Sequence, residues 1–394
     1  MTRWLLILGG IWVLGGNISA ARTRAIVLEF WNGFTGPDGK YIQRIVDAFN
    51  EEYQGQIRVN MVVMRWDDFY SKLALALRTK RGPNIGVVHY DNVYSVINQG
   101  IVEELDEYLN NFVIEDFVNS LWRVSLHEGH QYGIPLDFHP LVFYWNKDLF
   151  TAAGLDPEKP PGNREEFLAA CAAIKQAGLK KNGQEVWPCM IPCTWPHFLL
   201  WQHIFFCNGG RMFNRNCTQA TYDSAAGADA LQFLWDLIYQ YKYSPPHVMG
   251  IPGNEGKESF CRGTAAMLLE GIWMINAFEE TKGLNFGAKA ALNLGTGEHR
   301  IWSGGHSYEW AQAGMIPARY SVLSSKKFKE IPYLPTIAAD VDRFTFPVAH
   351  YRYTEGIQPL LEYLNLCLLN KILPSRAIAK AAWESTVQLQ QDPD

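Results

Sequence analysis

Strand-like and helix-like spacing of apolar residues alternates along the N-terminal part of this chain. Residues 26–30 form a short apolar run broken only by Glu29, which is typical of a largely buried strand. A loop with three glycines, a proline and two aromatic residues follows at 31–39. Apolar residues then recur at helical spacing at Ile42, Ile45, Val46 and Phe49. In open α/β sheets, ligands bind beyond the carboxyl end of such a strand, so this turn is the first candidate site.

The same alternation continues downstream. Period-2 spacing predicts a strand at 57–63, and the acidic pair Asp67 and Asp68 favours the start of the next helix. Further strands are predicted at 85–90, 133–137 and 141–145, and further helices at 93–99, 164–177 and 225–241. Strand–helix–strand order indicates mostly parallel sheets. Because no short repeat or low-complexity linker interrupts the chain, we predict two compact α/β lobes.

The first 21 residues have the pattern of a secretory signal. Arg3 is the only charged residue before Arg22, residues 4–16 are almost wholly apolar, and small residues occupy 19–21. An uncleaved anchor is the alternative, but the apolar run is shorter than the about 20 residues of a membrane span. With no cysteine near the cleavage site, a lipid anchor is not expected. We therefore predict a soluble periplasmic or secreted protein that begins near Arg22.

Composition narrows the class of ligand. The net charge of −5 leaves no basic surplus to neutralise phosphates, so nucleic acid is not an expected partner. The chain has 14 Trp, 18 Tyr and 21 Phe, and Trp rings pack well on the apolar faces of sugars. Seven cysteines allow disulfides but leave at least one thiol over. Those expected to pair, with the connectivity left open, are Cys189, Cys193, Cys207 and Cys217.

Several motifs occur in an order that carries a resemblance over about 26–388. They are Phe30-Trp31-Asn32-Gly33-Phe34-Thr35-Gly36-Pro37-Asp38-Gly39, Gly133-Ile134-Pro135, Tyr144-Trp145-Asn146-Lys147-Asp148-Leu149-Phe150, Ala153-Gly154-Leu155, Gly271-Ile272-Trp273 and Ile316-Pro317-Ala318-Arg319. Together they resemble the extracellular (periplasmic) solute-binding proteins, family 1, the sugar-binding components of ABC importers.

The resemblance implies a two-lobe periplasmic-binding-protein-like fold with discontinuous lobes, a hinge and a ligand-binding cleft. The first lobe would comprise 22–135 plus about 284–307, and the second 136–283 plus about 308–394, with a first crossing near residue 135 and a second near Gly283. One departure lies at Tyr308 and Glu309, where relatives carry about one more strand and one more helix of the first lobe. The implied partners are a carbohydrate and the membrane permease subunits of an importer, with the binding protein itself a monomer.

Candidate ligand-binding residues of the first lobe lie at the ends of predicted strands. They are Trp31, Asn32, Thr35, Trp66, Asp67 and Asp91. Trp66 and Asp67 would pair a stacking face with a carboxylate, a group that accepts sugar hydroxyls in charge-assisted hydrogen bonds. The alternative for Asp67 is a helix cap.

The remaining candidates follow the first crossing. They are Asp137, Tyr144, Trp195, Gly271, Trp273, Gly305 and His306. The resemblance implies that Asp137 and Tyr144 face the cleft. Gly271 is small enough to let the Trp273 ring lie flat over the cleft, and His306 would offer an imidazole donor.

No catalytic, cofactor or metal site is predicted. Two histidines, His127 and His130, are spaced to bracket a metal, but Gly129 between them favours a surface hairpin. A secreted carbohydrate-active hydrolase is the main alternative, because it too would need carboxylates in a cleft. A sensor that reports to a membrane receptor is another. The interpretation that fits most features is non-catalytic binding of a mono- or oligosaccharide.

Overall fold

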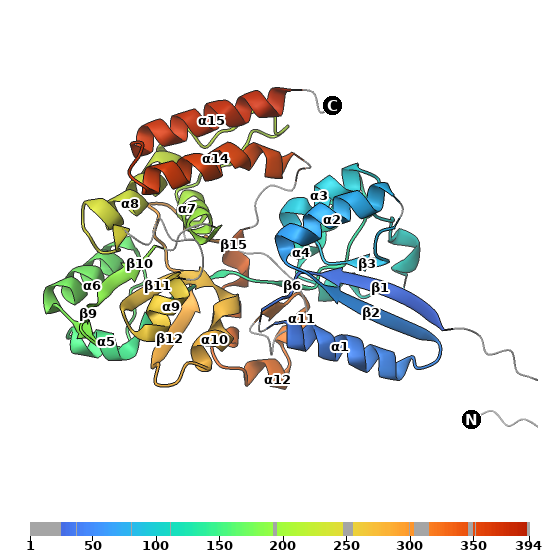
Figure 1. Cartoon of the computed structure of the whole chain (residues 1–394), viewed down its shortest axis with the longest axis horizontal. Coiled ribbons are helices and arrows are strands. Elements are labelled where there is room, and N and C mark those ends of the chain that lie inside the picture. The colour runs from blue at the N-terminus through green and yellow to red at the C-terminus, as the bar shows by residue number, and fades with distance from the viewer. Residues whose placement is uncertain are drawn as a thin grey trace, which may run out of the picture.

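The computed structural model shows two α/β lobes joined by extended segments, with a helical pair beside the second lobe (Figure 1). It describes residues 25–391 except 37, 80, 111, 192–194, 247–254, 299, 303–314, 346–349 and 351. The predicted signal, residues 1–21, lies outside the described part, as does the departure at 308–309. Among the described helices, none has both the length and the apolar character that crossing a bilayer requires.

The first lobe is built on a three-stranded parallel sheet with the order β2-β1-β3. Its elements are β1 (Ile26–Asn32), α1 (Gly39–Glu52), β2 (Ile57–Val63), α2 (Trp66–Arg78), β3 (Ile85–Gly86), α3 (Tyr90–Asn98), α4 (Asn119–Trp122), β4 (Leu126–His127) and β5 (His130–Gln131). Helix α1 buries Ile42 and Val46 in the same core as Phe30 of β1 and Val59 of β2. The predicted strand at 85–90 is much shorter than expected, because α3 already begins at Tyr90.

The second lobe contains a four-stranded sheet with the order β10-β11-β7-β12. Its elements are β7 (Leu141–Asn146), α5 (Lys147–Ala152), α6 (Arg164–Ala177), β8 (Lys180–Lys181), β9 (Gln184–Glu185), β10 (Trp187–Met190), α7 (Trp195–Cys207), α8 (Ala225–Tyr239), α9 (Glu255–Arg262), β11 (Ala265–Gly271), α10 (Ile275–Glu279) and β12 (Phe286–Ala290). Every residue of β7 is buried, as its unbroken apolar sequence predicts. The sheet is mixed rather than mostly parallel, since β7 runs antiparallel to both β11 and β12.

The predicted crossing near Gly283 is wrong. Strand β12 pairs with β7 along its whole length, so residues 286–290 belong to the second sheet and not to the first lobe. The chain stays there afterwards, because the Asn293 N–H donates to the Gly162 carbonyl at 3.3 Å. Conversely, part of the segment assigned to the second lobe contacts the first. The Val118 N–H donates to the Ala318 carbonyl at 2.8 Å, and Arg319 donates to Asp116.

The C-terminal part of the chain links and flanks the lobes. Its elements are β13 (Ile301–Trp302), β14 (Ile316–Pro317), α11 (Tyr320–Leu323), α12 (Lys326–Lys329), α13 (Leu334–Ala338), β15 (Phe344–Thr345), α14 (Tyr353–Leu368) and α15 (Pro374–Gln390). Strand β14 pairs with β6 (Asp137–Phe138) in the middle of the molecule (Figure 1). Contacts that span the lobes include those of Lys40, which lies 3.6 Å from Glu280, and of Thr354, whose hydroxyl donates to the Asp91 backbone carbonyl at 3.2 Å.

The cysteines do not follow the disulfide expectation. Six cysteines of the described chain are free thiols, among them Cys189, Cys207 and Cys217. Five of the six are buried, and Cys261 is half-buried. Cys193 lies outside the described residues. Sequence proximity therefore misled the prediction, because neighbouring cysteines sit on different elements of a densely packed lobe.

One amide side chain ties α1 to the sheet of the first lobe. The Asn50 side chain donates to the Val59 carbonyl at 2.9 Å and accepts from the Val59 N–H at 2.7 Å. Asn50→Ala leaves both backbone groups of Val59 without this partner, so we expect the free energy of unfolding to fall by about 1–3 kcal/mol. Urea unfolding followed by Trp fluorescence measures it. Asn60→Ala, at an exposed position of the same strand, is the control, and an equal loss in both variants would contradict this role.

Candidate functional site

A tryptophan and a histidine of the first lobe lie in tilted contact where the β1 and β3 segments end. Trp66, the first residue of α2, packs its ring on Gly33, where a Cβ atom would overlap the ring. The ring centroid of His89 lies 4.2 Å from that of Trp66. The absence of a side chain at Gly33 thus lets Trp66 lie against the turn after β1, as the Gly-rich sequence indicates.

Tyr70 holds the histidine in place. Its hydroxyl shares a 2.7 Å hydrogen bond with Nδ1 of His89 and accepts the His89 backbone N–H at 2.9 Å. Burial lowers the pKa of His89, so the imidazole is neutral at pH 7. Tyr70 follows Trp66 by four residues, so the two side chains lie on the same face of α2. Trp66, Tyr70 and His89 therefore form one ordered polar–aromatic group, which we call the first-lobe cluster.

Asp91 lies beside this cluster, in the first turn of α3. Burial raises the pKa of its carboxyl group, while nearby His89 and the hydrogen bond from the Asn92 amide act in the opposite direction. The backbone carbonyl oxygen of Asp91 accepts a hydrogen bond from the hydroxyl group of Thr354 in α14. Asp91 consequently stands at a point where the two lobes touch.

A second cluster comes from β6 and the end of β11. Asp137 is fully buried, and its Oδ1 lies 4.0 Å from Nε2 of His139. The His139 ring meets the Trp273 ring edge-on, with centroids 5.4 Å apart. Trp273 in turn packs on Gly271, where a Cβ atom would overlap the indole. Asp137, His139 and Trp273, the second-lobe cluster, thus repeat the arrangement of a ring seated on a glycine.

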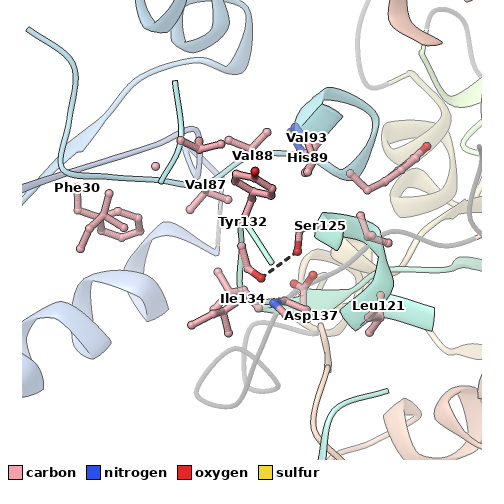
Figure 2. A pocket seen from close by; sticks show the side chains of 18 of the residues that line it. Phe30, Val87, Val88, His89, Val93, Leu121, Ser125, Tyr132, Ile134 and Asp137 are labelled. Carbon is pink, nitrogen blue, oxygen red and sulfur yellow. Dashed lines mark hydrogen bonds between the residues drawn. The ribbon is translucent and has the colours of Figure 1, made fainter. Parts of the chain in front are cut away.

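Polar members of both clusters line the same cavity, whereas Trp66 and Trp273 are not among its lining residues. A pocket of about 660 Å³ is lined by His89 from the first-lobe cluster and by Asp137 and His139 from the second (Figure 2). Burial and the neighbouring His89 lower the pKa of His139 to about 3, so both histidines are neutral at pH 7. The cavity therefore offers two neutral imidazoles, the Asp137 carboxyl group and aromatic rings such as Tyr132, a set suited to the hydroxyl groups and ring faces of a polar, uncharged ligand.

Comparison with known proteins places the chain in a family. Residues 34–317 match the family described as bacterial extracellular solute-binding protein. The chain belongs to this family. A binding protein of Brucella abortus (strain 2308) is 26% identical over 282 residues, which are 71% of this chain and 65% of the relative. An arabinooligosaccharide-binding protein of Halalkalibacterium halodurans is 26% identical over 68% of this chain and 57% of its own length. The match thus spans about two thirds or less of these relatives.

Solved structures of solute-binding proteins share the fold. The cyclic alpha-maltosyl-1,6-maltose binding protein of Arthrobacter globiformis superposes with a TM-score of 0.77 at 20% identity, covering 93% of this chain and 99% of that one. A solute-binding protein of Thermotoga lettingae with bound tagatose has a TM-score of 0.78 at 21% identity, covering 93% and 100%. These likenesses confirm the predicted two-lobe α/β fold.

Within this solute-binding fold, the predicted ligand residues separate into two groups. Trp66, Asp91, Asp137 and Trp273 lie in or beside the two clusters. Tyr144 does not: it is fully buried among Phe residues of the second lobe, and its hydroxyl donates to the Gly271 carbonyl at 3.0 Å. Tyr144 therefore supports the glycine under Trp273 from behind the site.

The residues of the first turn have mostly structural contacts. Asn32 is buried and its side chain accepts the Phe34 N–H at 3.1 Å, which shapes the turn. Thr35 is exposed, and Trp31 is half-buried with its indole N–H donating to Glu29 at 3.2 Å. The side chains of Asp67 and Trp195 lie outside the described part of the structure, as do Gly305 and His306.

Sequence reasoning overlooked His139, Tyr70 and Glu270. His139 follows Asp137 by two residues in an extended segment, and Tyr70 follows Trp66 by four in a helix, so same-face spacing could have identified both. Glu270 is buried beside Gly271 and gave no signal, because its sequence context is an apolar strand.

The histidine pair at 127 and 130 forms the predicted hairpin away from the cavity. His127 pairs with His130 across β4 and β5, and Gly129 has the left-handed φ of 93° that the turn needs. Nδ1 of His130 lies 2.7 Å from Asp106 and 2.9 Å from Glu104, and these carboxylates raise the pKa of His130. The three side chains are close enough to ligate a metal ion, but their mutual hydrogen bonds already account for the grouping.

Glu270 makes the stability of the second lobe depend on pH. Burial raises its pKa from 4.5 to about 7, although the Gly271 N–H donates to it at 2.8 Å. A folded-state pKa above the unfolded one means that stability falls as the pH rises from about 4.5 to about 7. Glu270→Gln removes this loss. We therefore expect its free energy of unfolding, relative to that of the parent, to be about 3 kcal/mol higher at pH 8 than at pH 5.

Urea unfolding at these two pH values tests the prediction. Glu362→Gln, at an exposed position of α14, is the matched control. Its unfolding free energy should differ from that of the parent by the same amount at both pH values. A Glu270→Gln variant whose difference from the parent is also independent of pH would show that this carboxyl ionises normally in the folded protein.

Gly33 should be required for the position of Trp66. In Gly33→Ala the new methyl group collides with the ring, so we expect a loss of about 1–3 kcal/mol in unfolding free energy and a changed near-UV circular dichroism signal. Gly86→Ala is the control, since its Cβ would make only an ordinary 3.9 Å contact with Phe69. Equal stability and spectra for the two variants would refute the close packing of Trp66 on the turn.

Proposed function

We propose that this protein captures a carbohydrate, non-catalytically, between its two lobes and delivers it to the permease subunits of an ABC importer. The observation that carries the proposal is that His89 of the first-lobe cluster and Asp137 and His139 of the second-lobe cluster line a single cavity. Trp66 and Trp273 would stack on ring faces, and Asp91 and Asp137 would accept hydroxyl groups. The protein would act as a monomer outside the cytoplasm after removal of the predicted signal.

The relatives include both sugar-binding and anion-binding proteins, so the side chains that line the cavity must decide between the two ligand classes. One relative is an arabinooligosaccharide-binding protein, while that of Pectobacterium atrosepticum, 24% identical, is a periplasmic sn-glycerol-3-phosphate-binding protein. A phosphate ligand calls for cationic groups, but His89 and His139 are neutral, and the one arginine of the lining, Arg319, is already paired with Asp116. The chemistry of the cavity is therefore better matched to an uncharged saccharide.

Binding would be coupled to lobe closure. Ligand contacts from both clusters exist together only when the lobes are close, so a bound saccharide shifts the population toward the closed form. The contacts of Asp91 with Thr354 and of Lys40 with Glu280 lie on such a closing interface. The permease would then recognise the closed form. A sensor function would use the same closure with a different membrane partner.

A hydrolase is less consistent with these groups. Glycoside hydrolysis needs two carboxyl groups fixed on either side of one bond, one of them a proton donor. Of the two candidate carboxyl groups, Asp137 lines the cavity and Asp91 does not, so the two do not flank one point of it, and each lies beside a histidine. Their arrangement fits hydrogen-bond acceptors rather than an acid–nucleophile pair.

A thermal-shift panel of mono- and oligosaccharides tests the proposal. A ligand that binds only the folded state raises the melting temperature by mass action, and chromatography after long incubation should find the sugar unchanged. Trp273→Ala should weaken binding of the active sugar by about tenfold or more, whereas Trp383→Ala, at a highly exposed indole of α15, should not. A cooperatively melting protein that responds to no sugar would contradict the proposal, and hydrolysed product would favour the enzyme.

A further inference from the structure

The cavity extends well beyond the polar clusters into the first lobe. All of its lining residues from β1, β2 and α1 are apolar: Leu28, Phe30, Val59, Ile42, Ile45, Val46 and Phe49. The residues from α1 follow helical spacing, so one face of the helix is directed at the cavity. The groups of the clusters, His89, Asp137 and His139, enter the lining only from later segments of the chain. The cavity is therefore amphipathic, with an apolar part inside the lobe.

The cavity in this part of the lobe is large enough for a ligand. Protein interiors are normally close-packed, with few voids larger than a water molecule. A volume of about 660 Å³ is instead within the range of ligand pockets, about 300–1,000 Å³. Water is a poor occupant of an apolar cavity, because it needs several polar partners there.

Polar side chains elsewhere in the lining are engaged with the protein itself. The Ser125 hydroxyl donates to the Gly133 carbonyl at 2.9 Å (Figure 2), and the Arg319 guanidinium donates to Asp116 at 2.7 Å. These contacts satisfy groups that would otherwise favour a polar occupant. Two apolar side chains of the lining, Ile85 and Ile134, are 45% and 44% exposed, so the cavity has a rim at the protein surface.

We propose that the apolar part of the cavity binds the aliphatic chain of an amphipathic glycoside, whose sugar portion lies at Asp137 and His139. The proposal rests on the proposed function and specifies its ligand class. The continuity of one cavity from the clusters to α1 is what joins the two portions of the ligand. Each methylene buried against Val46 and Val59 would add affinity through the hydrophobic effect.

Isothermal titration calorimetry with an alkyl series tests the assignment. The probes are maltose and its hexyl, octyl and decyl β-D-glycosides, each below its critical micelle concentration, titrated into the full-length mature protein. We expect the Kd to fall by about fourfold for each added methylene. Val46→Phe and Val59→Phe, one from the helix and one from the sheet, fill the cavity and should remove this dependence on chain length. Val387→Phe, at an exposed position of α15, is the control and should keep the dependence of the Kd on chain length.

The outcomes separate this inference from the function on which it rests. A sugar of the panel that binds equally well with and without an alkyl chain leaves the proposed function standing and overturns the inference. Chain-length-dependent binding that both cavity-filling variants abolish supports it, even if no free sugar binds. Chain-length dependence that survives in both variants, or no binding of any alkyl glycoside, overturns it.

Discussion

The cleft depends on how the chain crosses between the lobes at β6 and β14. Phe138 pairs with Ile316 and Asp137 with Pro317, so two extended segments far apart in sequence lie side by side at the centre of the molecule. This pairing buries Asp137 completely and sets His139 next to it, at the boundary of the lobes. The flanking contacts of Ala318 with Val118 and of Arg319 with Asp116 tie the same crossing to the first lobe. Without it, neither lobe alone would enclose the site.

Each lobe presents its aromatic ring by the same physical device. A glycine without a side chain lets a tryptophan lie against the backbone, Gly33 under Trp66 and Gly271 under Trp273. Groups behind the rings then hold the arrangement: Tyr70 fixes His89 in the first lobe, and Tyr144 binds the Gly271 carbonyl in the second. Rings seated in this way lose little conformational freedom when a ligand arrives, which favours binding.

Local patterns predicted much of this structure. The helix at 164–177 has the predicted bounds, and the apolar run at 141–145 is a fully buried strand, because both signals arise from residues near in sequence. The sequence did not predict that β12 pairs with β7, because this contact joins segments far apart in the chain and does not affect the local spacing of apolar residues. Tyr144 was misplaced for a related reason: in a strand buried on both faces, alternation does not tell which side chains reach the cleft.

The sequence predicted which types of residue form the candidate site better than it predicted how they are arranged. Trp66, Asp137 and Trp273 were proposed from turns and from the resemblance, whereas the sequence did not show that His89 and His139 line one cavity. The central claim is that one saccharide is held by both lobes. Small-angle X-ray scattering with and without a saturating active sugar tests it most directly: we expect a smaller radius of gyration with the sugar. A sugar that binds and leaves the radius of gyration unchanged would contradict capture between the lobes.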